Sequence, residues 1–62
     1  MTKKDYILIA SAIKAERASY GEGRTAERLA IKALAISLAD DLRLENPRFD
    51  YWKFIEACGI SE

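Results

Sequence analysis

The segment from Asn46 to Gly59 constrains the fold more than any other part of the chain. Asn46-Pro47 predicts the end of a helix, because proline disfavours helical geometry in the residue before it and has no amide hydrogen. Asp50 is placed to cap a following helix, and Gly59 is placed to end that helix. A helix of roughly eight residues is not stable alone. It must therefore lie on the rest of the chain.

This segment also holds four of the six aromatic residues in the protein. Phe49 directly precedes the predicted cap and Phe54 lies four residues after it, which is the spacing of a hydrophobic staple. The residues that share one face of the short helix, or lie at its edge or its end, are Tyr51, Trp52, Phe54, Ile55, Cys58 and Ile60. The pattern indicates a docking element whose orientation is fixed by packing.

Helical periodicity extends over nearly all of the remaining sequence. Thr2 and Asp5 have the spacing of a capping box, so a first helix begins there. Its predicted core face is formed by Tyr6, Ile9, Ala10, Ile13, Arg17 and Tyr20. Gly21 and Gly23 are expected to end this helix, with glycine in the left-handed conformation. We expect an all-α single domain over residues 1–62, with helices at 3–20, 26–45 and 50–58 that form a helical hairpin plus a short C-terminal helix.

The second helix is apolar on two sides. Ile31, Leu34, Leu38 and Leu42 form the predicted core stripe, flanked by Ala30 and Ala35, while Leu29, Ala33 and Ile36 form a stripe on the opposite side. A helix with two apolar sides requires two neighbours. They are either the first and third helices of the same chain, or one of them is the same helix of a second copy. The residues predicted for self-association are Leu29, Ile31, Leu34, Ile36, Leu38 and Leu42.

The small size of the chain supports the same expectation. A core built from 62 residues rarely supplies more than roughly 3–5 kcal/mol. Disulfides and metal sites are the usual supplements in small domains, but the chain has one cysteine and no histidine. Self-association is the remaining supplement, so a homo-oligomer, and most simply a homodimer, is predicted.

Charge and residue types exclude several classes of function. Ten basic and ten acidic residues cancel, which argues against a protein that mainly grips nucleic-acid phosphates. The first 32 residues carry seven basic and four acidic side chains, and the others carry three and six. Asp40 and Asp41 are adjacent on a helix, so their carboxylates point about 100° apart and do not converge. Cys58 has no histidine to activate it and is interpreted as a small buried apolar residue. We therefore predict a non-enzyme with no catalytic residues, no metal and no cofactor.

Three functions stay open. In the favoured one, the protein binds another protein through Arg48, Tyr51, Trp52 and Lys53. The alternative is a small nucleic-acid-binding regulator, for which the candidate residues are Lys3, Lys4, Lys14, Arg24 and Arg28. The third is a structural part without a site.

The N-terminus does not have the pattern of a secretory signal, and no run approaches the roughly 20 apolar residues of a membrane span. With a lone cysteine, these features predict a cytoplasmic protein.

Both ends of the chain resemble a known group of sequences. The matching residues are Thr2 to Tyr6 with Leu8, Ile9, Ala10 and Ile13, and Asn46 to Asp50 with Phe54 and Ala57-Cys58-Gly59. They are similar to small uncharacterised proteins encoded by bacteriophages and mobile elements. Tyr51 and Trp52 depart from that pattern, in which small residues followed by arginine are more usual. The resemblance implies an accessory protein of phage or plasmid type and carries no activity.

Overall fold

The computed structural model describes residues 2–60, which form three α-helices and no strand. The helices are α1 (Lys3–Ser19), α2 (Thr25–Glu45) and α3 (Tyr51–Ala57). The predicted all-α fold is therefore confirmed, and each helix begins and ends within one residue of its predicted bounds. Among these residues, no helix combines the length and the apolar character needed to cross a bilayer.

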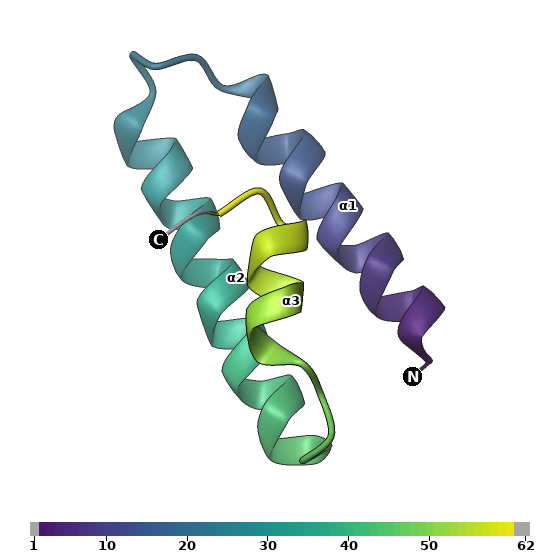
Figure 1. Ribbon diagram of the computed structural model, residues 1–62. Helices are drawn as coiled ribbons and strands as arrows, with labels where there is room; N and C mark the ends of the chain where they lie inside the picture. The colour runs from purple at the N-terminus through teal and green to yellow at the C-terminus, as the bar shows by residue number, and fades with distance from the viewer. Residues whose placement is uncertain (1, 61–62) are drawn as a thin grey trace.

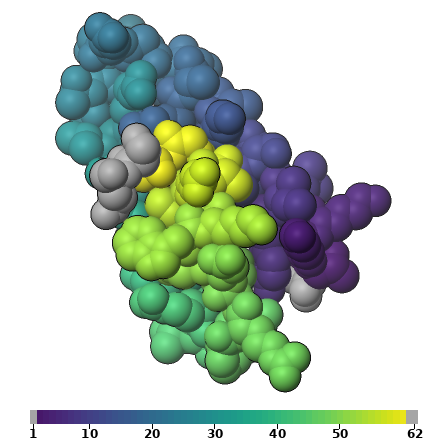
Figure 2. Space-filling model, in the orientation of Figure 1, coloured from purple at the N-terminus to yellow at the C-terminus, as the bar shows by residue number. Residues whose placement is uncertain are grey.

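The three helices pack in an up-down-up order in which every pair is in contact. Figure 1 shows α1 and α2 as an antiparallel hairpin, with α3 lying between them on one side. α3 runs in the direction of α1, and it covers the middle of the hairpin on the face drawn in Figure 2. The molecule is elongated, with dimensions of 36 × 18 × 16 Å, because the two long helices determine its length.

Local hydrogen bonds explain where the helices begin and end. The Thr2 amide donates to the Asp5 carboxylate at 2.9 Å, which confirms the capping box of α1. The Asp50 carboxylate accepts from the Lys53 amide at 3.1 Å and caps α3 as predicted. α3 ends in a Schellman motif, since the Ile60 amide donates to the Ile55 carbonyl and Gly59 has a φ of 80°.

The end of α1 lies where it is predicted, but the predicted cause, a left-handed glycine, is wrong. Gly59 is the one glycine with a positive φ, so neither Gly21 nor Gly23 adopts the left-handed conformation. α1 ends because Tyr20 takes an extended backbone conformation, with φ of −93° and ψ of 132°. The Arg24 amide then donates to the Gly21 carbonyl at 3.0 Å and closes the turn before α2.

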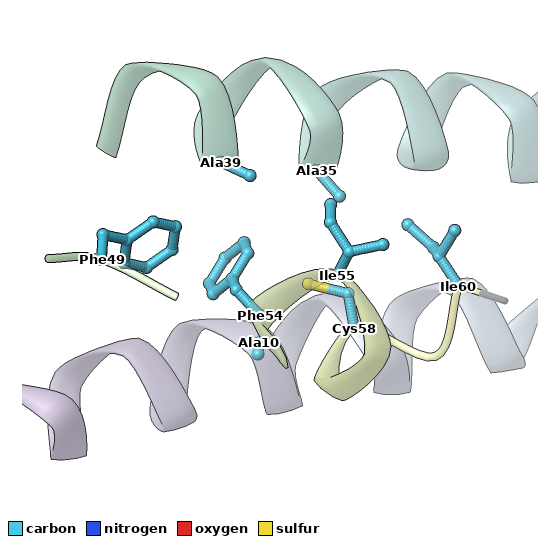
Figure 3. Packing of buried hydrophobic residues seen from close by; sticks show 8 residues of the cluster. All are labelled: Ala10, Ala35, Ala39, Phe49, Phe54, Ile55, Cys58 and Ile60. Atoms are coloured by element: carbon cyan, nitrogen blue, oxygen red, sulfur yellow. The ribbon is translucent and has the colours of Figure 1, made fainter. Parts of the chain in front are cut away.

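The core combines small residues of the long helices with large residues of the C-terminal segment. Its buried members are Ala10, Ala35, Ala39, Phe49, Phe54, Ile55, Cys58 and Ile60. Figure 3 shows that the large side chains of the C-terminal segment occupy the space between α1 and α2, where the alanines leave room for them. The predicted core face of α1 is confirmed, because all of its members are buried or half-buried. α3 is therefore a wedge that completes the core.

The predicted core stripe of α2 is partly wrong. Leu34 is 62% exposed, and Ile36, which was placed on the opposite stripe, packs against the core. The buried line of α2 runs through Ala35 and Ala39, with Leu38 and Leu42 packed beside it. The physical reason is the packing of α3, whose bulky side chains fit against alanine. α2 therefore faces α3 with its alanines rather than with the stripe of its largest apolar side chains.

Candidate functional site

A groove between α1 and α3 has a volume of about 490 Å³. It lies where the N-terminal half of α1 meets the turn before α3 and α3 itself, the purple and green atoms of Figure 2. Its apolar floor consists of Tyr6, Ile7, Ala10, Phe49, Phe54 and Ala57, and its polar rim consists of Lys3, Asn46, Arg48, Asp50 and Lys53. We call this feature the α1/α3 groove.

Aromatic packing fixes the floor of the groove. The rings of Tyr6 and Phe49 meet edge to face with centroids 4.8 Å apart, and the rings of Phe49 and Phe54 are 5.4 Å apart. The second contact confirms the predicted hydrophobic staple. Because Phe49 contacts both α1 and α3, it holds the two walls of the groove at a defined separation.

The turn that carries the rim is also held by specific hydrogen bonds. The Phe49 amide donates to the Asn46 carbonyl at 2.9 Å, and the Arg48 amide donates to the Asn46 side-chain oxygen at 3.2 Å. Pro47 lies between them and restricts the backbone further. Arg48 is therefore presented from a rigid turn rather than from a mobile loop.

The rim of the groove is positively charged. Lys3, Arg48 and Lys53 supply three cations, and Asp50 supplies the one carboxylate. Asp50 is already engaged as the cap of α3. Neither of the two ion pairs within residues 2–60 includes any of the three cations. The groove therefore offers an apolar surface beside cations that have no carboxylate partner in the described chain.

The structure separates the four residues that were predicted to bind a partner. Arg48 and Lys53 line the α1/α3 groove, whereas Tyr51 and Trp52 do not. Residues two apart on a helix point about 200° apart, so Tyr51 and Lys53 leave α3 on opposite sides. Tyr51 contacts α2 instead, with the Arg43 guanidinium 4.6 Å from the centre of its ring. Trp52 packs edge to face on Tyr51 at 4.9 Å and is 62% exposed.

The residues predicted for self-association also divide into two groups. Ile36, Leu38 and Leu42 pack against the core and are half-buried, as is Ile31. Leu29 and Leu34 are exposed and are available to another molecule. Self-association itself stays a prediction.

The basic residues of the nucleic-acid alternative do not form one patch. Lys3 lies in the α1/α3 groove, and the Lys14 side chain lies beside Gly59. Arg24 and Arg28 belong to the opposite end of the hairpin, where Arg24 pairs with Glu27 at 3.9 Å and Arg28 donates to the Tyr20 carbonyl at 3.4 Å. α1 alone separates the two ends by about 25 Å.

Two of the reactive side chains considered in the sequence are buried or paired. Cys58 is a fully buried free thiol, and burial raises its pKa, which disfavours the reactive thiolate. Within the described range, no three His, Cys, Asp or Glu side chains gather to hold a metal ion. Asp40 is engaged by Arg43 at 3.2 Å, and both side chains are exposed.

The sequence pattern missed the joint position of Lys3, Arg48 and Lys53. The sequence pattern groups Lys3 with the other basic residues of the first half, because no local signal links it to a turn more than forty residues away. The cations come together only because Phe49 packs on Tyr6. The hydrophobic staple of Phe49 and Phe54 is the sequence feature that comes closest to predicting this site.

Comparison with protein-family models, with curated proteins and with solved structures finds no match for this chain.

Proposed function

We propose that this protein is a non-enzymatic interaction module that binds an acidic segment of another protein in the α1/α3 groove. The observation that carries the proposal is the combination of an apolar floor with Lys3, Arg48 and Lys53 at the rim. A partner segment of matching chemistry places apolar side chains on the floor and carboxylates beside the cations. The resemblance of both chain ends to phage and mobile-element proteins supports an accessory role.

The composition of the groove favours a protein over a nucleic acid. Base stacking requires exposed ring faces, but Phe49 and Phe54 are buried and show little surface in the floor. Binding to nucleic-acid phosphates requires a larger excess of positive charge than three cations provide on a chain with no net charge. Apolar anchors within a charged rim are instead the usual anatomy of a protein interface.

Two adjacent lysines provide a matched test. Lys3 lines the groove, whereas Lys4 is exposed and does not line it. We would measure the binding of a fluorescein-labelled peptide in which two leucines are flanked by glutamates, by fluorescence anisotropy. Lys3→Glu and Lys53→Glu are expected to weaken binding by more than about tenfold, because each removes one attraction and adds one repulsion. Lys4→Glu is expected to change it by less than about twofold.

A short single-stranded DNA serves as the competing probe. The proposal is overturned if the peptide does not bind, or if the substitutions at Lys3 and Lys4 weaken its binding equally. Tighter binding of the DNA, reduced equally by both lysine substitutions and strongly by salt, would support the nucleic-acid regulator instead.

A further inference from the structure

The side of the α1/α2 hairpin that lies away from α3 is a second surface of different chemistry. On α2, Arg43 stacks on Tyr51 and therefore marks the flank that faces α3. Leu34 precedes Arg43 by nine residues, or two and a half turns, so it lies on the opposite flank. On α1, Lys14 lies beside Gly59, and Ile9 points about 140° away from Lys14. Ile9 and Leu34 therefore face the side that α3 leaves open.

Apolar residues continue along both flanks. Ile13 follows Ile9 by four residues on α1, and Ile31 and Leu38 lie one turn before and after Leu34 on α2. Four of these five side chains are half-buried, because part of the surface of Ile9, Ile13 and Leu38 packs against the core, and Leu34 is largely exposed. We call them the α1/α2 face.

The edges of the α1/α2 face are acidic. On α1, Asp5 precedes Ile9 by one turn and Glu16 follows it by two turns. On α2, Glu27 and Asp41 lie two turns before and two turns after Leu34. Arg24 pairs with Glu27 at 3.9 Å, whereas no ion pair among the described residues includes Asp5, Glu16 or Asp41. The α1/α2 face thus has the opposite charge to the rim of the α1/α3 groove.

The length of the α1/α2 face indicates the size of a partner that fits here. The 17 residues of α1 give the face a length of about 25 Å, which suits one helix of similar length.

We infer that the α1/α2 face binds a basic amphipathic helix of a partner protein, which adds a fourth helix to the bundle. Its apolar stripe packs against Leu34 and its neighbours, and its lysines or arginines lie beside Glu16 and Asp41. A second copy of this chain is disfavoured, because two-fold pairing about Leu34 brings Glu27 of one copy opposite Asp41 of the other. This inference is independent of the α1/α3 groove.

The test uses two synthetic helical peptides of about 17 residues with the same leucine stripe. One carries lysines beside the stripe and the other carries glutamates, and both are titrated into labelled full-length protein. The lysine peptide is expected to bind at least about tenfold more tightly. Leu34→Glu should weaken its binding by more than about tenfold, since it removes a central apolar anchor.

Two adjacent aspartates supply the control for charge. Asp41 lies on the α1/α2 face, whereas Asp40 points about 100° away and pairs with Arg43. Asp41→Lys should weaken binding of the lysine peptide several-fold more than Asp40→Lys does. Circular dichroism verifies that each variant is folded.

Three results would overturn the inference. The first is equal binding of the two peptides, and the second is equal effects of the two aspartate substitutions. The third comes from sedimentation: a wild-type dimer that Leu34→Glu converts to a monomer would show that a second copy occupies the face. Loss of acidic-peptide binding in the α1/α3 groove, by contrast, would leave these measurements unaffected.

Discussion

The packing of α3 between the long helices predicts very different losses of stability when Ile55 and Leu34 are each replaced by alanine. Ile55 is 2% exposed and lies between the long helices, so Ile55→Ala should cost about 2–5 kcal/mol of unfolding free energy. Leu34 buries little more than a third of its surface, and full burial of a leucine contributes about 1.5–3 kcal/mol. Leu34→Ala should therefore cost about 1 kcal/mol or less.

Urea unfolding followed by far-ultraviolet circular dichroism measures both variants. A domain of this size has roughly 3–5 kcal/mol to lose, so Ile55→Ala should be largely unfolded in buffer, while Leu34→Ala should keep a clear transition. Ile55→Val should be intermediate, at about 0.5–1.5 kcal/mol, and provides a variant that still folds. A loss for Leu34→Ala that equals or exceeds the loss for Ile55→Ala would refute the assignment of the core to α3.

Three further predictions concern the C-terminal segment and are all measured by urea or thermal unfolding. Gly59→Ala should destabilise the fold by about 1–2 kcal/mol, because φ is 80° and the added Cβ would lie 3.0 Å from Lys14 Cγ; Gly21→Ala, with neither constraint, should be neutral or slightly stabilising. Asp50→Ala should cost about 1 kcal/mol through loss of the α3 cap, and Asp50→Asn should retain most of that stability. Burial raises the pKa of the Cys58 thiol, so the unfolded chain loses this proton at lower pH than the folded chain does. The contribution of the protonated thiol to the free energy of unfolding should then be complete below the ordinary thiol pKa and should fall as pH rises past it. Cys58→Ala should not show this fall.

Local signals were sufficient to predict the helices. The capping box at Thr2, the cap at Asp50 and the glycine at Gly59 each act through neighbouring backbone atoms, so their residue types carry the information. The staple of Phe49 and Phe54 is equally local. These features determined the start of α1 and both bounds of α3 to within one residue.

Tertiary packing was not predictable in the same way. The apolar pattern of α2 identifies more than one side as apolar, and only the shape of the neighbouring element decides which side is buried. Since α3 contributes bulky side chains, Ala35 and Ala39 face it and Leu34 does not. The α1/α3 groove has the same origin, because Lys3 and Arg48 meet only through the contact of Tyr6 with Phe49.

The opposite charges of the two surfaces follow from the same packing. α3 lies against one side of the hairpin and brings Arg48 and Lys53 to Lys3, while the side that it leaves open carries Glu16 and Asp41. A neutral chain can thus present two charged surfaces. Both binding proposals rest on this separation of charge.

Amide chemical-shift mapping with the acidic peptide, on uniformly ¹⁵N-labelled protein, tests the proposed function most directly. The account predicts that the largest shifts fall on Lys3, Lys53, Phe54 and Ala57, which line the α1/α3 groove, with little change at Leu34. Shifts that centre on Tyr51 and Trp52, or that spread evenly over the surface, would contradict it.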